Sequence, residues 1–148
     1  DSLDHQSSEP VGSVRVEADG LRPLEIASHD VPALIDELPV LAALGVYGGG
    51  LIVRGATELR AKESDRIAVL VAGLRRRGVR VDELPDGFRV FRGARPEGGT
   101  VDAGGDHRMA MAFAIIALGC QNPTTITGHE AVSVSYPGFF DVLSTLRR

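Results

Sequence analysis

The sequence predicts an α+β fold in which one supersecondary unit occurs twice. Two apolar helices each follow an acidic residue, Asp36 in the first and Asp106 in the second, at a spacing of about 70 residues. The strand-like segments that come next align at their glycines, Gly55 and Gly128. A loop and an amphipathic helix follow each of these glycines. We therefore expect strands in a mixed sheet, with helices packed beneath it.

Composition excludes several classes of protein. The chain has 148 residues, of which 43% are hydrophobic, enough for one domain with a real core. Its net charge of −4 argues against broad electrostatic binding to nucleic acid or to an anionic membrane. No apolar run is long enough to span a membrane. The single cysteine, Cys120, excludes an intrachain disulfide and fits a reducing compartment, and its apolar neighbours indicate a buried thiol.

The first third of the chain predicts two strands and one buried helix. Residues 1–10 are polar and indicate a linker or a frayed end. Alternating residues at 11–18 predict a strand, and 21–26 predicts a second strand that its proline confines to a sheet edge. After a turn at 29–32, the apolar run at 33–44 predicts a helix that is buried on most sides.

Two carboxylates, Asp36 and Glu37, stand at the entrance of that helix. Carboxylates at a helix N-terminus are often caps. A cap and a functional role are therefore both open for this pair.

The remaining elements follow from the same patterns. Glycines break the chain, apolar runs form strands or helices by their length, and a Pro-Asp-Gly turn joins two alternating runs. The predictions, in chain order, are a buried strand at 51–53, a helix ending at the arginines 75–77 before Gly78, a hairpin of 79–84 and 88–91, a short strand at 100–101, a helix at 109–118, a strand at 124–127, a loop at 129–135 and a last helix from Pro137.

The most informative stretch is residues 60–66, which carries five charges in seven positions. Ser64 or the residue before it is a plausible N-cap, which would place Lys62 and Glu63 at the helix start and Arg66 in the first turn. Backbone N–H groups and the helix dipole favour an anion there, and an arginine fork can grip a carboxylate or phosphate. The alternative is a solvated, well-capped helix start.

A second charged entrance, Gly-Asp-His-Arg at 105–108, opens the helix at 109–118. Asp106 is expected to cap this helix and to orient Arg108. His107 is expected to be an orienting or a packed histidine. If the two units are equivalent, both charged helix starts converge on one cleft.

Four segments resemble, in the right order, the C-terminal part of one enzyme family. They are IDELPVL at 35–41, ELRAKESDRI at 58–67, GDHRMAMAFA at 105–114 and SVSYPGFF at 133–140. The chain from residue 11 to 148 thereby resembles the EPSP synthases, or 5-enolpyruvylshikimate-3-phosphate synthases. The resemblance implies a two-domain enzyme of six βαβαββ units, of which this chain holds about two.

The resemblance also implies a reaction. The enolpyruvyl group of phosphoenolpyruvate passes to the 5-hydroxyl of shikimate 3-phosphate and phosphate leaves, with no metal or organic cofactor. It implies a base at Asp36, a hydroxyl contact and proton shuttle at Lys62, an acid at Glu63, and carboxylate-binding guanidinium groups at Arg66 and Arg108. Two carboxylates in different environments suit the two proton transfers, and cations suit an anionic substrate.

The resemblance further implies what this chain lacks. The segments that would hold the shikimate phosphate and much of the phosphoenolpyruvate phosphate lie upstream. The missing N-terminal portion of the enzyme is therefore the implied partner, and the chain alone is expected to be inactive. Many family members have a lysine where this chain has Val134. A bacterial cytoplasmic enzyme of the shikimate pathway is expected.

Two alternatives remain. One is the sister enolpyruvyl transferase acting on UDP-N-acetylglucosamine, which shares the fold. The other, from a different class, is a non-catalytic fragment or binding module derived from the same fold.

Overall fold

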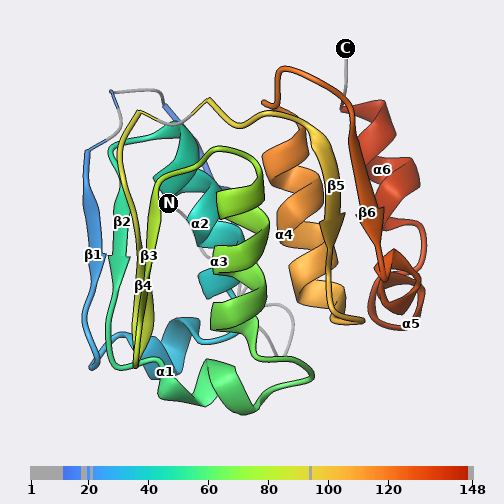
Figure 1. The fold of residues 1–148 in the computed structure, drawn as a ribbon. Helices are drawn as coiled ribbons and strands as arrows, with labels where there is room; N and C mark the ends of the chain where they lie inside the picture. Colours follow the sequence, from blue (N-terminus) through green and yellow to red (C-terminus); the bar gives the residue numbers. More distant parts are fainter. Residues whose placement is uncertain (1–11, 18–19, 21, 94, 147–148) are drawn as a thin grey trace.

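The computed structural model describes residues 12–17, 20, 22–93 and 95–146, and it contains two β-sheets with helices between them (Figure 1). The first sheet is mixed and has the order β1-β2-β4-β3. The second consists of parallel β5 and β6. The strands are β1 (Leu24–Ile26), β2 (Leu51–Val53), β3 (Val81–Leu84), β4 (Gly87–Val90), β5 (Gly99–Asp102) and β6 (Thr124–Thr127).

The long helices form the middle layer. Helices α2, α3 and α4 lie between the sheets and pack on each other and on the strands (Figure 1). The helical elements are α1 (Val31–Leu34), α2 (Leu38–Tyr47), the 3₁₀ turn η1 (Thr57–Ala61), α3 (Arg66–Arg76), α4 (His107–Ala117), the 3₁₀ turn η2 (His129–Ala131), α5 (Val132–Ser135) and α6 (Phe139–Thr145). None of the helices in the described ranges is both long and apolar enough to cross a membrane.

The predicted repeat is present in the topology. In each unit two parallel strands flank a buried helix: β1 and β2 flank α2, and β5 and β6 flank α4. The strands β2 and β6 are followed by Gly55 and Gly128, whose φ angles of 76° and 73° lie in the left-handed region that favours glycine. The α+β prediction is therefore confirmed.

Several local predictions are also confirmed. The hairpin is formed by β3 and β4, and β1 is an edge strand, as the proline at 23 indicated. Helix α3 ends at its arginines, and Gly78 follows with φ 73°. Helix α4 begins at His107, two residues before its predicted start.

The strand predicted at 11–18 is wrong for the residues that can be described. Residues 12–17 have no regular structure, and Val14 and Val16 are 89% and 88% exposed. A strand needs a neighbour for its backbone groups, and among the described residues this segment has none. The linker predicted at 1–10 lies outside the described residues.

The helix predicted at 33–44 is two helices. Helix α1 starts at Val31, inside the predicted turn, and α2 starts at Leu38, where Pro39 fits the first turn. Asp36 and Glu37 therefore lie at the junction between the helices. Glu37 occupies the N-cap position of α2, but its side chain accepts no cap hydrogen bond, so the capping interpretation of these carboxylates is wrong.

Two predictions near the C-terminus also need correction. The loop predicted at 129–135 is helical, as η2 and α5, and Val132 is buried in it. The last helix, α6, begins at Phe139, after Gly138 at its N-cap position, so Pro137 precedes the helix instead of starting it.

Candidate functional site

The start of α3 is held by a short polar network. Its N-cap is Asp65 and not Ser64, because Asp65 Oδ1 accepts a hydrogen bond from the backbone N–H of Ala68 at 2.9 Å. Arg60 Nη1 donates to Asp65 Oδ2 at 2.9 Å. The turn η1 thereby brings residues 62–64 to the mouth of the helix, and the apolar stripe of α3 fixes the helix in the core.

Arg66 is the centre of the site and is surrounded by three carboxylates. Its side chain is 1% exposed, and it donates from Nε to Asp106 at 2.7 Å, from Nη1 to Asp36 at 3.1 Å and from Nη2 to Glu63 at 2.6 Å. Burial alone would lower the pKa of Arg66, but the hydrogen bonds and charges of these carboxylates, with Asp106 foremost, raise it. A buried guanidinium group needs such partners to offset its desolvation.

Asp106 links the two helix starts. It is fully buried and caps α4 by accepting from the backbone N–H groups of Arg108 at 2.9 Å and Met109 at 3.3 Å. Ser64 Oγ donates to its other oxygen at 3.1 Å. Burial would raise the pKa of Asp106, but Arg66 and the backbone N–H groups hold it below its usual value. The predicted cap of α4 by Asp106 is confirmed. The guanidinium group that Asp106 binds is that of Arg66, whereas Arg108 donates only its backbone N–H to Asp106.

Arg108 reaches from α4 to the junction of α1 and α2. Its Nη1 donates to the backbone oxygen of Asp36 at 2.9 Å and to Glu37 Oε1 at 3.3 Å, and its Nη2 lies 3.4 Å from Asp36 Oδ2. The Arg108 side chain is 30% exposed, in contrast to Arg66. Of the two guanidinium groups, Arg108 is therefore the one that a ligand in solvent can reach.

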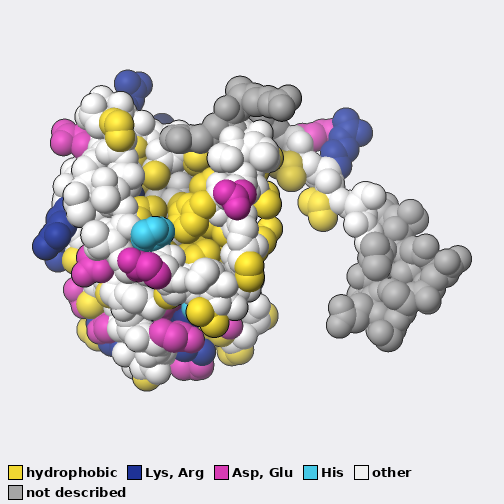
Figure 2. All heavy atoms as spheres, turned by 90° about the vertical axis from the view of Figure 1, so that its right-hand side faces the viewer, with side chains coloured by type: hydrophobic (Ala, Val, Ile, Leu, Met, Phe, Trp, Pro, Cys, Tyr) yellow, Lys and Arg dark blue, Asp and Glu magenta, His cyan; other side chains and the backbone are white. Residues whose placement is uncertain are grey.

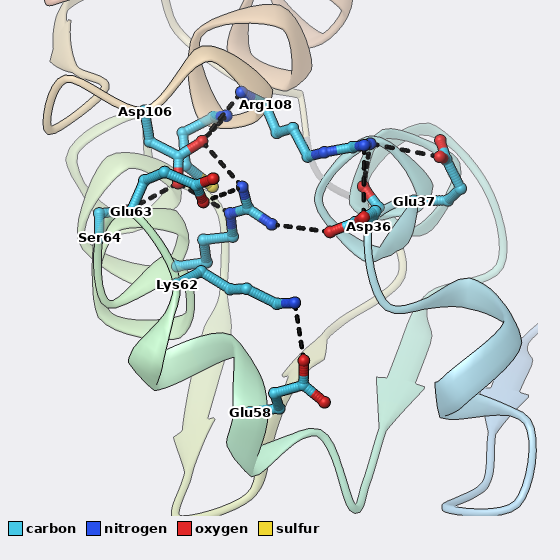
Figure 3. A network of polar contacts seen from close by, with 10 residues as sticks. Asp36, Glu37, Glu58, Lys62, Glu63, Ser64, Asp106 and Arg108 are labelled. Carbon is cyan, nitrogen blue, oxygen red and sulfur yellow. Dashed lines mark hydrogen bonds and ion pairs between the residues drawn. The ribbon is translucent and has the colours of Figure 1, made fainter.

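Lys62 forms an ion pair with Glu58 of its own segment (Figure 3). Its Nζ is 2.7 Å from Glu58 Oε1, one helical turn earlier. The hydrogen bond to Glu58, followed by the charges of Glu58 and Asp36, raises the pKa of Lys62, so the amine is a cation at neutral pH. It is a donor here and not a base.

The structure thus brings together five residues that the sequence singled out: Asp36, Lys62, Glu63, Arg66 and Arg108. Their roles in a reaction stay predictions. His107 lies half-buried in the first turn of α4.

Sequence reasoning missed one carboxylate of the site, Glu58, which could have been found from its i, i+4 spacing to Lys62. For Glu37 the sequence left a cap and a functional role both open, and no local pattern pairs it with Arg108. Within the described ranges, no group of three or more His, Cys, Asp or Glu side chains is placed to hold a metal ion.

Fold comparison first defines the class of protein. The chain superposes on a solved EPSP synthase from Acinetobacter baumannii with a TM-score of 0.80 and 33% sequence identity, over 85% of this chain and 30% of that one. A second structure of EPSP synthase from the same organism gives 0.77 and 30% over the same shares. The fold is thus a partial enolpyruvyl transferase fold, as the sequence resemblance implied.

Sequence comparison gives the particular family. The model of the family described as EPSP synthase (3-phosphoshikimate 1-carboxyvinyltransferase) matches residues 5–143, and the chain belongs to this family. Curated proteins named 3-phosphoshikimate 1-carboxyvinyltransferase are 46% identical over 143 residues in Thermotoga sp. (strain RQ2) and in Koribacter versatilis. These alignments cover 95% and 96% of this chain but 34% of each relative. The chain therefore spans about a third of the length of these relatives.

Proposed function

We propose that this chain forms part of the active site of a 3-phosphoshikimate 1-carboxyvinyltransferase. The reaction would transfer the enolpyruvyl group of phosphoenolpyruvate to the 5-hydroxyl of shikimate 3-phosphate. The observation that carries the proposal is the meeting of two charged helix starts, from α3 and α4, at the α1–α2 junction. The family match favours the shikimate substrate over UDP-N-acetylglucosamine.

The residues fit an addition followed by an elimination. The 5-hydroxyl oxygen bonds to C2 of phosphoenolpyruvate and gives its proton to Asp36, while C3 takes a proton from Glu63. The bond between C2 and the phosphate oxygen then breaks, a proton returns from C3 to Glu63, and the double bond is restored; Asp36 releases the hydroxyl proton to solvent. Lys62 donates hydrogen bonds to the shikimate hydroxyls, and the arginines hold the carboxylate of phosphoenolpyruvate.

The cage around Arg66 sets the order in which a carboxylate can bind. Every nitrogen of Arg66 already donates to a carboxylate, and its side chain is 1% exposed. An incoming carboxylate therefore meets the exposed Arg108 first. It reaches Arg66 only by displacing Asp36 or Glu63, whose side chains are 42% and 53% exposed, because Asp106 is fully buried.

This exchange connects binding with proton transfer. Glu63 Oε2 lies 2.6 Å from Arg66 Nη2, so this ion pair holds the Glu63 side chain on Arg66. Once the substrate carboxylate takes its place, Glu63 is released from Arg66 beside the bound enol. Once free of Arg66, Glu63 can take up a proton from solvent and deliver it to C3.

We propose that the remainder of the enzyme must complement this chain. The two phosphate groups of the substrates need cations that the site described here does not supply. Holding both substrates in reacting geometry accounts for roughly 7–11 kcal/mol of a typical barrier, and a half-built site cannot provide it. The isolated chain should therefore release no phosphate.

The test is a phosphate-release assay with both substrates. The purified chain is assayed at high concentration, alone and after addition of the separately expressed two thirds of the Thermotoga relative that has no counterpart in this chain. We expect turnover only in the mixture. A mixture with the Asp36→Asn variant should fall by at least 100-fold. Turnover by the chain alone would overthrow the need for complementation, and an inactive mixture that has assembled would favour the non-catalytic binding module.

A further inference from the structure

Glu37 carries a carboxylate that its own helix does not use. The residue occupies the N-cap position of α2, yet its side chain accepts no cap hydrogen bond. Its backbone angles, φ −95° and ψ −13°, are helical, whereas capping side chains usually project from an extended backbone. The second residue of the helix is Pro39, which has no N–H to donate. The structure of α2 therefore does not explain this carboxylate.

The Glu37 side chain instead contacts Arg108 (Figure 3). Arg108 Nη1 donates to Glu37 Oε1 at 3.3 Å and to the backbone oxygen of Asp36 at 2.9 Å. A terminal guanidinium nitrogen carries two N–H groups, so these two acceptors take both. Arg108 Nη2 lies 3.4 Å from Asp36 Oδ2. A carboxylate that binds both terminal nitrogens of Arg108 must therefore displace Glu37 from Nη1.

The two acceptors on Nη1 differ in how firmly they are held. The Asp36 oxygen belongs to the backbone at the junction of α1 and α2, and its contact with Arg108 is the shorter one. The Glu37 contact is longer, and the Glu37 side chain is 58% exposed. An ion pair this exposed contributes little stability and is screened by salt. The backbone of Asp36 therefore positions Arg108, and Glu37 is the partner that can be exchanged.

Glu37 also differs from the other carboxylates around the two arginines. The exposed fractions of their side chains are 58% for Glu37, 53% for Glu63, 42% for Asp36 and 0% for Asp106. Glu37 thus leaves its cation for solvent at the lowest cost. It takes no part in the proposed proton transfers, so its removal changes the ligand-binding face of Arg108 and leaves the proposed acid and base in place.

The largest hollow on the opposite side of the chemistry is unsuited to anions. Figure 2, which views the side of β6 and α6, shows hydrophobic side chains gathered in a hollow, and its volume is about 460 Å³. Of the described residues that line it, none is charged. An anionic ligand added to this chain therefore finds no cation there, and its binding reports on the arginine site.

We propose that Glu37 acts through Arg108 as an internal competitor for the carboxylate of the substrate. In the free site the Glu37 carboxylate occupies Arg108 Nη1; an incoming carboxylate replaces it, and Glu37 turns to solvent. A ligand with one carboxylate gains little from this exchange, whereas a ligand that is also held by a second group tolerates its cost. The naming of that ligand as phosphoenolpyruvate rests on the proposed function, while the exchange at Arg108 rests on the contacts.

Titration of the chain with phosphoenolpyruvate tests the competition, with the NMR signal of the Arg108 Nε–H group as the readout. Glu37→Ala should lower the Kd by roughly 2–5-fold, the range that the loss of an exposed ion pair allows. Glu37→Gln should fall between this variant and wild type, because its amide oxygen can still accept a hydrogen bond. Thermal unfolding should be unchanged in both variants, since Glu37 does not cap α2.

Asp30→Asn is the matched control. Asp30 occupies the N-cap position of α1, also without a side-chain cap bond, and its side chain is 47% exposed beside His29. This variant removes the same charge away from Arg108 and should change the Kd by less than about 1.5-fold in physiological salt. Equal tightening in Asp30→Asn would assign the effect to net charge and refute the proposal. Weaker or unchanged binding by Glu37→Ala, or no response at Arg108, would refute it as well.

The complemented enzyme supplies a kinetic test. Glu37→Ala, mixed with the portion of the Thermotoga relative that has no counterpart in this chain, should lower KM for phosphoenolpyruvate by roughly 2–5-fold, with the effect in KM and not in kcat. In an Arg108→Ala background the same substitution should have no effect on KM, because Glu37 acts through Arg108. If the chain binds more tightly but the mixture is inactive, the competition stands and the proposed function fails. If the mixture turns over with an unchanged KM, the function stands and the competition fails.

Discussion

The buried pair of Asp106 and Arg66 makes a sharp prediction for stability. Asp106→Ala removes the carboxylate that receives Arg66 Nε at 2.7 Å and leaves a guanidinium group of 1% exposure without its closest buried partner. It also removes the N-cap of α4, which accepts two backbone N–H groups. Both losses act on the folded state, so the variant should unfold at lower temperature.

The magnitude follows from the two contacts. Breaking a buried ion pair by removing one partner costs about 3–5 kcal/mol, and losing an N-cap costs about 0.5–2 kcal/mol. Asp36 and Glu63 remain on Arg66 and offset part of the first loss. We therefore expect about 3–5 kcal/mol in total, which lowers the midpoint of unfolding by roughly 10–15 °C for a chain of this size.

The assay is thermal and urea denaturation of the chain, with two control variants. Asp106→Asn keeps an oxygen for the cap but loses the charge, and it should fall between wild type and Asp106→Ala. Asp36→Asn changes a carboxylate that is 42% exposed, so it should cost at most about 1 kcal/mol. If Asp106→Ala costs no more than Asp36→Asn, the buried pair is not what holds the two helix starts together.

The other predictions concern pH, packing, charge and binding. The pKa of Asp106 in the folded chain is below its ordinary value of 3.8, so the ionised carboxylate stabilises the fold above that pH. This stabilisation is lost as the pH falls through the lower pKa of the folded state. The difference in unfolding free energy between wild type and Asp106→Asn should therefore narrow in acid titrations below about pH 4. Gly73→Ala would place a Cβ 2.4 Å from Phe113 Cζ, so overpacking of about 1–3 kcal/mol should outweigh the helix-propensity gain of about 1 kcal/mol, and urea denaturation should show a less stable chain. Arg77→Met removes a buried guanidinium group whose nitrogens have no hydrogen-bond partner among the described residues, so the midpoint of thermal unfolding should not fall. A lower midpoint would show that the stacking of the guanidinium group on the ring of Phe113 outweighs the cost of its desolvation. In the complemented enzyme, Arg108→Ala should weaken phosphoenolpyruvate binding by about 1.5–3 kcal/mol and shikimate 3-phosphate binding much less, with partial recovery in Arg108→Lys; equal losses in calorimetric titrations of the two substrates would contradict the assignment.

Much of the fold could be predicted because its signals are local. Apolar periodicity and glycine stops located β2, α3, α4 and β6 to within about two residues. The errors arose where tertiary contacts decide. Residues 11–18 alternate like a strand but have no neighbour to pair with in the described part of the chain. The run at 33–44 is continuous in hydropathy, yet it turns at residues 35–37 and starts a new helix at Leu38.

The site could be predicted in membership but not in connectivity. Charged residues at two helix starts, together with the family resemblance, indicated which side chains meet. The pairing itself depends on contacts between distant positions: Arg66 binds Asp36 over 30 residues and Asp106 over 40, and Arg108 binds Asp36 over 72. No local pattern shows that Arg66 is enclosed while Arg108 remains accessible, because this difference arises when α4 packs against α2 and α3.

The charge balance of the assembled site then bears on function. The network holds three cations and five carboxylates, namely Lys62, Arg66 and Arg108 against Asp36, Glu37, Glu58, Glu63 and Asp106. With all of them ionised, the site carries a net charge of −2 before any ligand enters. A site of this charge repels the two phosphorylated substrates of the proposed reaction, unless cations from elsewhere outweigh the carboxylates. The proposed acid and base at this site therefore require that the phosphate-binding cations come from the complementing portion of the enzyme.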